Sequence, residues 1–384
     1  MSLTVVAVIL CVSAALQLGY FLVLLWPAVC EAGRNEKERM METNQPPVSV
    51  VICACNEAEN LKRHLPAVLL QCYADFEVIV INDRSDDQTA QVLLEMARQH
   101  PRLRIVTISP EAPRLFPGKK FALSKGVAAA ANDFLLLTDA DCQPASPYWL
   151  SAMVQPLTNG KEIVAGFGDF YQEKGALNAF IRGETLHTFL QLLAYQKAGM
   201  PYMAVGRNLA CRKYLLEQAA QHPLWRATPS GDDDMLVRIG ATKENMAVVT
   251  NPAAQTYSAA KSDFKSYIRQ KQRHLSTGKL YRKKVSFLLA LYAVSHAFFW
   301  MSSLFFFGII IFTKNHFSGS WVMLAFLFFT LRCALFWYLL TRFQRHLRPK
   351  EKRVRFLPYF DFMWLLYNFA FSPYILWKNK QDWR

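Results

Sequence analysis

"VSVVICACNE", residues 48–57, is an apolar run that ends in two polar residues, Asn56 and Glu57. Four of its first seven residues are Val or Ile, which favour strands. An apolar run of this length is typical of a strand that is buried on both faces, as in a parallel sheet. We therefore predict a buried strand followed by a polar loop.

The chain on the C-terminal side repeats this pattern. Three further apolar stretches are "FEVIVINDRSDD" (76–87), "LRIVTIS" (103–109) and "DFLLLTDADCQP" (133–144). The segments between them, 60–71, 88–100 and 121–132, have helical spacing of their apolar residues. Strands that alternate with helices predict an α/β domain with a mostly parallel, Rossmann-like sheet.

Polar side chains follow three of the four predicted strands. They are Asn56 and Glu57 after the first strand, Asp83, Asp86 and Asp87 after the second, and Asp139 and Asp141 after the fourth. Asp also favours turns, so one cluster alone is compatible with a simple turn. Ligands of open α/β sheets bind beyond the carboxyl ends of the strands. Three clusters at one sheet edge therefore predict a binding site.

The chemistry of these residues indicates a nucleotide-diphosphate substrate. Two carboxylates, Asp139 and Asp141, stand one residue apart, and such a pair can hold Mg²⁺ with phosphate oxygens completing its shell. "FPGKKF" (116–121) places Lys119 and Lys120 after a glycine, in a position suited to a diphosphate. The chain contains neither G-x-G-x-x-G nor a P-loop sequence, which excludes those two nucleotide sites.

Four apolar runs lie outside this domain. Residues 1–30, 285–312 and 319–341 are predicted to be transmembrane helices, because about 20 apolar residues span a bilayer. Residues 356–377 contain Asp361 and two prolines, so this segment is predicted to be transmembrane, interfacial or re-entrant. The first run has no basic residue before it, which favours an uncleaved anchor over a signal peptide.

The positive charge lies beside these runs. The chain has a formal net charge of +15, and residues 261–284 contain nine Lys or Arg against one Asp. Residues 342–355 contain seven Lys or Arg against one Glu. Basic membrane flanks stay in the cytoplasm and attract anionic headgroups, which makes nucleic-acid binding the weaker interpretation. We expect an integral protein of a bacterial inner membrane with its central region, residues 45–284, in the cytoplasm.

Eight cysteines without a C-x-x-C pair are typical of a reduced, cytosol-facing protein.

Arg332 lies within a membrane segment, where an ionisable residue is a functional candidate. We expect it to pair with Asp361 or a lipid headgroup, or to extend to the interface. The stretches 174–201 and 262–284 are expected to be core helices or helices that lie on the bilayer.

Seven segments, in order, resemble the inverting family 2 glycosyltransferases, which have a GT-A fold. They are "VVICACNE", "VIVINDRSDDQT", "GKKFALSKG", "LLLTDADC", "GRNLACRK", "GDDDML" and "QKQRH" (270–274). The last is similar to the Q-x-x-R-W of membrane-bound synthases and ceramide glucosyltransferases, with His274 in place of Trp. Arg84 stands where Gly is common, and Cys55 stands where an aromatic residue is frequent.

The resemblance implies a role for each matching position. Asp233 would be the catalytic base, Asp232 the acid before it, and Asp234 a solvated or capping residue. Asp141, with Asp139, would bind Mg²⁺ or Mn²⁺. The donor nucleotide would be bound by Ala54, Glu57, Asp83, Lys119, Asp139, Gln270, Arg273 and His274.

The implied domain order is an anchor (1–30), a GT-A domain (45–260), a basic interfacial helix with the Q-x-x-R-H sequence (261–284) and C-terminal membrane segments. The implied activity is inverting, metal-dependent transfer from a nucleotide-diphosphate sugar, with UDP favoured, to a hydroxyl group of a membrane lipid. The alternatives are a small processive polysaccharide synthase and an inactive membrane sensor with the same fold. The oligomeric state stays open.

Overall fold

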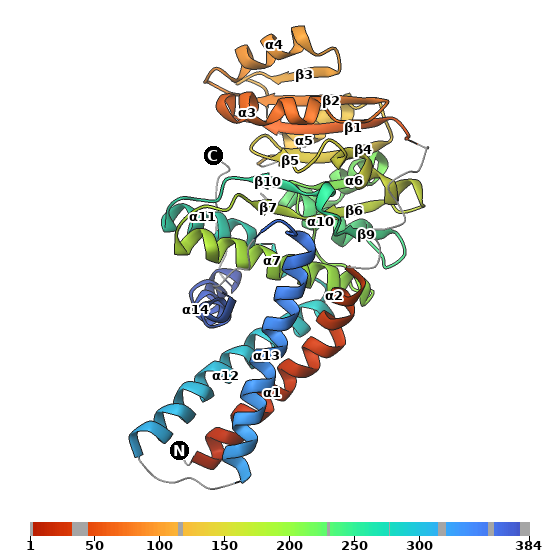
Figure 1. The fold of residues 1–384 in the computed structure, drawn as a ribbon. Coiled ribbons are helices and arrows are strands. Elements are labelled where there is room, and N and C mark those ends of the chain that lie inside the picture. The colour runs from red at the N-terminus through yellow and green to blue at the C-terminus, as the bar shows by residue number, and fades with distance from the viewer. Residues whose placement is uncertain are drawn as a thin grey trace.

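The computed structural model describes residues 3–32, 45–113, 118–228, 231–275, 277–313, 320–351 and 357–376. A layered α/β domain lies above a bundle of long apolar helices, and helices α7 (Ala176–Lys197) and α2 (Trp26–Ala32) lie at the junction (Figure 1). This arrangement confirms the predicted fold class, a GT-A-like domain between N-terminal and C-terminal apolar helices.

The main sheet has seven strands in the order β3-β2-β1-β4-β8-β6-β9. Strands β1 (Val48–Ala54), β2 (Phe76–Asp83), β3 (Leu103–Ile108) and β4 (Phe134–Asp139) are the four predicted ones, and they are parallel. Register brings Asp139 opposite Cys53 and Asn82 opposite Ala54. The polar strand ends therefore meet at one edge, as expected.

Both faces of this sheet are covered. Val48, Val50 and Ile52 pack with α3 (Ala58–Leu69) and α6 (Trp149–Thr158), and the alternate residue Val51 packs with α5 (Lys120–Ala129). Helix α4 (Thr89–Gln99) follows β2. Gly126 allows α5 to approach the sheet, because a Cβ there would lie 2.5 Å from Ile81 Cδ1.

The second half of the domain was not predicted from the sequence. Strands β8 (Leu209–Arg212), β6 (Ile163–Gly166) and β9 (Met246–Val249) extend the sheet, and β8 is antiparallel to β4 and β6. A small sheet contains β5 (Gln143–Pro144), β10 (Thr256–Ser258) and β7 (Gly168–Phe170). Strands this short carry little periodicity, so only their tertiary partners define them.

The remaining helices of the domain are α8 (Lys213–Gln221), α9 (Pro223–Ala227), α10 (Asp232–Gly240) and α11 (Phe264–Leu275), with short 3₁₀ turns at Pro252–Ala254 and Gly278–Leu280. Helix α7 is largely buried between the domain and the apolar bundle. For residues 174–201 the structure therefore favours a core helix over one that lies on the bilayer.

Three helical segments of the described chain are long and apolar enough to cross a membrane: Leu3–Ala32, Lys283–Phe312 and Ser320–Leu347. The first comprises α1 (Leu3–Tyr20), a π-helical turn (Phe21–Leu25) and α2, and the others correspond to α12 (Lys283–Thr313) and α13 (Ser320–Leu347). Helix α14 (Leu357–Leu376) is seen nearly end-on in Figure 1, whereas α12 and α13 run along the picture. One face of α14 packs on α7, where Phe360 occupies the space beside Gly183.

A buried ion pair joins these helices. Arg332 of α13 donates to both carboxylate oxygens of Asp361 in α14, and it also donates to Gln17 Oε1 of α1 at 2.9 Å. Both charged side chains are fully buried. Of the roles expected for Arg332, the structure shows the pair with Asp361.

A second buried pair joins the end of α13 to the α/β domain. Arg348 donates through Nε and Nη2 to the two oxygens of Asp169 in β7, each at 2.6 Å. Arg182 of α7 donates to the Phe170 carbonyl at 3.0 Å beside it. The small sheet and the bundle of apolar helices are therefore connected through hydrogen-bonded charges.

Candidate active site

The candidate site lies where β1, β2 and β4 end. The loops after β1 and β2 are joined, because Ser85 Oγ accepts from the Asn56 N–H at 3.0 Å and Asn56 Oδ1 accepts from the Asp86 N–H at 2.9 Å. Asn56 and Arg84 both have left-handed backbones, with φ of 59° and 57°. The left-handed φ at position 84 gives a physical reason why Gly is common there.

The predicted nucleotide-binding residues of these loops differ in accessibility. Ala54 is fully buried at the end of β1, with neither its side chain nor its backbone exposed. Asp83 is 1% exposed and pairs with Arg84, whose guanidinium also donates to the Ala112 carbonyl at 2.8 Å. Glu57 is half-buried and accepts from Asn60 Nδ2 at 2.6 Å. Burial, followed by the charges of Asp141 and Asp139, raises the pKa of Glu57, which places it beside the acidic pair.

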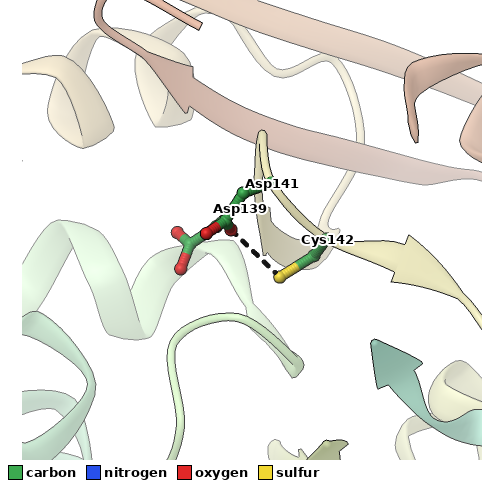
Figure 2. A group of neighbouring side chains, drawn as sticks. All are labelled: Asp139, Asp141 and Cys142. Atoms are coloured by element: carbon green, nitrogen blue, oxygen red, sulfur yellow. Dashed lines mark hydrogen bonds between the residues drawn. The ribbon is translucent and has the colours of Figure 1, made fainter. Parts of the chain in front are cut away.

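Asp139 and Asp141 form the core of a candidate metal centre. Their carboxylates and the Cys142 thiol offer atoms within 4.8 Å of one another (Figure 2). The thiol donates to Asp141 Oδ1 at 3.4 Å, and burial raises its pKa well above the ordinary value. A neutral thiol is a poor ligand for Mg²⁺ or Mn²⁺, which prefer oxygen. Two carboxylates in an accessible position therefore fit a hard divalent cation, with further positions open to phosphate oxygens.

The two lysines of "GKK" have different roles. Lys119 pairs with Asp139, and its charge outweighs burial so that the pKa of Asp139 lies below its ordinary value. Lys120 is fully buried, and it donates to the Trp225 carbonyl at 3.1 Å and to Thr228 Oγ1 at 2.6 Å. Burial lowers the pKa of Lys120 to about 8. Lys119 is the lysine available to a diphosphate, whereas Lys120 holds the segment that leads to α10.

The acidic run Asp232, Asp233 and Asp234 forms the first turn of α10, after Gly231 with φ of 76°. A helix N-terminus favours negative charge, which offsets part of the repulsion among the three acids. Asp233 Oδ2 accepts from the Gly206 N–H at 2.8 Å and Oδ1 accepts from the Asp234 N–H at 2.9 Å. Burial and the neighbouring Asp232 raise the pKa of Asp233 to about 6.

Asp234 corrects an expectation, because it is neither solvated nor only a cap. It is 8% exposed, and it accepts from Thr277 Oγ1 at 2.6 Å. Burial, followed by the charge of Asp233, raises its pKa well above the ordinary value, which favours a neutral carboxyl group. The sequence did not reveal this burial, because the partner is 43 residues away.

Helix α11 carries the Q-x-x-R-H residues. Arg273 contributes to the lowered pKa of Asp139, so its charge acts on the acidic pair. Gln270 is half-buried on the same helix. The side chain of His274 lies outside the described part of the chain.

Arg207 is a site residue that the sequence reasoning did not select. It lies next to Gly206, which contacts Asp233, and its charge lowers the pKa of Asp139. Its guanidinium donates to the Gly168 carbonyl and lies 4.2 Å from the centre of the Phe170 ring. The signal was present in "GRNLACRK", where Arg207 is a further cation whose charge acts on Asp139.

Comparisons with known proteins agree with this geometry. A family model described as "Glycosyltransferase like family 2" matches residues 46–277, well over half of the chain. A probable glycosyltransferase of Bacillus subtilis, YdaM, is 27% identical over 333 residues, which cover 79% of this chain and 74% of that protein.

Shorter matches include a beta-monoglucosyldiacylglycerol synthase of Trichormus variabilis, 30% identical over 33% of this chain and 27% of that protein. They also include a poly-beta-1,6-N-acetyl-D-glucosamine synthase of Staphylococcus epidermidis, 33% identical over 24% of this chain and 21% of that protein. Among solved structures, the mannosyltransferase PcManGT of Pyrobaculum calidifontis, in complex with GDP-Man and Mn²⁺, has a TM-score of 0.56 at 19% identity. That match covers 91% of this chain and 100% of the other, and it shows a shared fold.

Proposed function

The chain belongs to glycosyltransferase family 2, and from that membership we propose that it transfers a sugar, with inversion, from a UDP-sugar to a hydroxyl group of a membrane lipid. The observation that carries this proposal is the position of Asp233. Its carboxylate is held by Gly206, next to the residue whose charge acts on Asp139. The charge of Lys119 acts on both Asp233 and Asp139, which supports one site that contains the base and the diphosphate-binding residues.

Each residue has a defined task in this reaction. Asp233 accepts the proton of the attacking hydroxyl, for which a pKa of about 6 is suitable because the carboxylate form predominates at neutral pH. Lys119, Arg207 and Arg273 surround the acidic pair with positive charge, which stabilises a leaving diphosphate. A divalent cation held by Asp139 and Asp141 would add charge at the same phosphates. One base suffices for a single inverting displacement.

The lipid acceptor is supported by the attachment of the domain to apolar helices. The basic helix α11 contacts α14, with Tyr267 and Phe371 ring centres 6.3 Å apart. The exposed face of α14 is apolar and includes Tyr359, Leu366 and Phe369. We propose that α14 lies in the interface of the bacterial inner membrane, with the catalytic domain in the cytoplasm.

A small polysaccharide synthase is the second candidate, favoured by the similarity to the Staphylococcus epidermidis synthase. Three candidate spans in the described chain make a channel formed by one copy less favourable.

An inactive sensor is the third candidate function. Asp83, Asp139, Asp141 and Asp233 are all present, which supports an active enzyme over a sensor.

The proposed function is tested with purified protein and a panel of UDP- and GDP-sugars, with Mg²⁺ or Mn²⁺ and with or without bacterial lipid extract. We expect nucleotide release that requires lipid, stops in EDTA and returns when Mn²⁺ or Mg²⁺ is added. Mass spectrometry of the product separates a glycolipid from a polymer. Release that is unaffected by EDTA would contradict the metal site, and no turnover with any donor would favour the sensor.

The pH profile should follow Asp233. Acid protonates this group as the pH falls through about 6, so kcat/KM should decline about tenfold per pH unit below 6 and level off above it. The profile is measured at subsaturating donor, with circular dichroism at each pH to confirm that the fold persists. A midpoint near pH 4, the range of an ordinary carboxyl group, would contradict the assignment.

A further inference from the structure

Asp234 joins the catalytic loop to the segment that enters the membrane bundle. This segment, here the connector, comprises residues Thr277–Arg282 and leads directly into α12. Asp234 Oδ2 accepts from Thr277 Oγ1 at 2.6 Å and from the Tyr281 hydroxyl at 3.4 Å. Two hydroxyl groups of the connector therefore converge on one buried oxygen.

The rest of α10 packs along the connector. Arg238 donates to the Leu280 carbonyl, and Arg282 Nη2 donates to the Ala241 carbonyl at 3.3 Å. At the start of the helix, a Cβ on Gly231 would lie 2.2 Å from Thr277 Cγ2. Contacts at the beginning, middle and end of α10 fix it against the connector.

Asp234 also contacts the loop that orients Asp233. The Ala204 N–H donates to Asp234, and the Gly206 N–H, two residues later, donates to Asp233 Oδ2 at 2.8 Å. The two adjacent acids are therefore held by alternate backbone groups of one extended loop. A displacement of Asp234 would move the group that holds Asp233.

We propose that Asp234 is a positioning residue, which fixes Asp233 relative to the acceptor by joining loop 204–206 to the membrane-attached connector. The inference rests on the proposed function, in which Asp233 is the base. Asp234 itself does not contact substrate. Its role is to accept hydrogen bonds, so a neutral amide at this position can replace it, whereas a methyl group cannot.

Four variants test this inference in the full-length protein in detergent. D234A and T277V each remove one side of the contact, and D234N and T277S each keep it. A misplaced catalytic group can cost about 10²-fold, so we expect D234A and T277V to lower kcat between about 10-fold and 100-fold. We expect D234N and T277S to stay within about threefold of the parent protein. T158V, which removes a helix-end hydroxyl outside the site, is the matched control.

Three readouts separate positioning from simple loss of stability. The Kd of UDP, from calorimetry, should stay unchanged in all variants while kcat falls. The double variant D234A/T277V should be no slower than the slower single variant, because both remove the same contact. Hydrogen exchange of the peptide that contains Ala204 should be faster in D234A than in D234N.

The inference fails if D234A keeps the parental kcat, or if the effects of D234A and T277V multiply in the double variant. It also fails if the Kd of UDP rises by the same factor as kcat falls, or if exchange of the Ala204 peptide is the same in D234A and D234N. If no sugar of the UDP and GDP panel turns over, the proposed function fails. The exchange measurement then still decides whether Asp234 anchors the loop.

Discussion

The variant D233N should lose almost all transfer while retaining nucleotide binding. General-base catalysis contributes about 10²–10⁴-fold, so kcat should fall by a factor in that range. Asn has the same shape as Asp, and its one oxygen can still accept from the Gly206 N–H, although the bond from the Asp234 N–H is lost. The hydrogen bond that holds loop 204–206 should therefore persist. The amide cannot take the proton of an attacking hydroxyl, which isolates the chemical step.

The measurement is nucleotide release with the donor and lipid extract that give turnover, together with a UDP titration. D133N is the matched control, because Asp133 is exposed and pairs with Arg212 at the other end of β4. It should behave as the parent protein does. Near-normal turnover in D233N would remove Asp233 as the base and leave Asp232 as the next candidate.

The sequence was most informative for residues whose burial and position are determined by the single strand that carries them. β1, β2 and β4 are nearly continuous apolar runs, and parallel register alone brings Asp83 and Asp139 to one sheet edge. Those placements needed no knowledge of distant partners. Arg332 and Asp361 also could be paired from the sequence, because an unpaired charge within a membrane is costly.

The sequence was least informative where burial depends on partners that are remote in the chain. Lys119 and Lys120 are adjacent and chemically identical, yet contacts with Trp225 and Thr228 make Lys120 a buried structural residue. Asp234 was expected to be a solvated or capping residue. Its environment is set by Thr277 and Tyr281, which belong to the segment before α12. Local pattern cannot report such a contact.

The buried ion pair between α13 and α14 gives the largest expected effect on stability. Asp361 accepts from Arg332 and also contacts His296 Nε2 at 3.0 Å, and all three side chains are fully buried. The Arg332 guanidinium lies 4.6 Å from the centre of the Phe299 ring. Removing one member of a buried pair costs about 3–5 kcal/mol, because the other charge stays buried without compensation.

We therefore expect R332L to lower the midpoint of thermal unfolding in detergent strongly and to reduce the yield of folded protein. The double variant R332L/D361L should recover most of that loss, because two apolar side chains can replace a buried ion pair at little cost. R342L is the matched control, since Arg342 lies on the same helix, exposed, and donates to the Tyr338 hydroxyl at 2.8 Å. Its effect should stay within about 0.5 kcal/mol.

Activity per folded molecule decides between a structural and a functional role for the pair. If the pair only joins α1, α13 and α14, the folded fraction of R332L/D361L should transfer sugar at the parental kcat with lipid extract. If Arg332 instead acts on a lipid headgroup, the double variant should be stable but slow at low lipid concentration. An R332L protein with the parental unfolding midpoint would contradict the structural role. Such a result would mean that burial of Asp361 without its partner does not reduce stability.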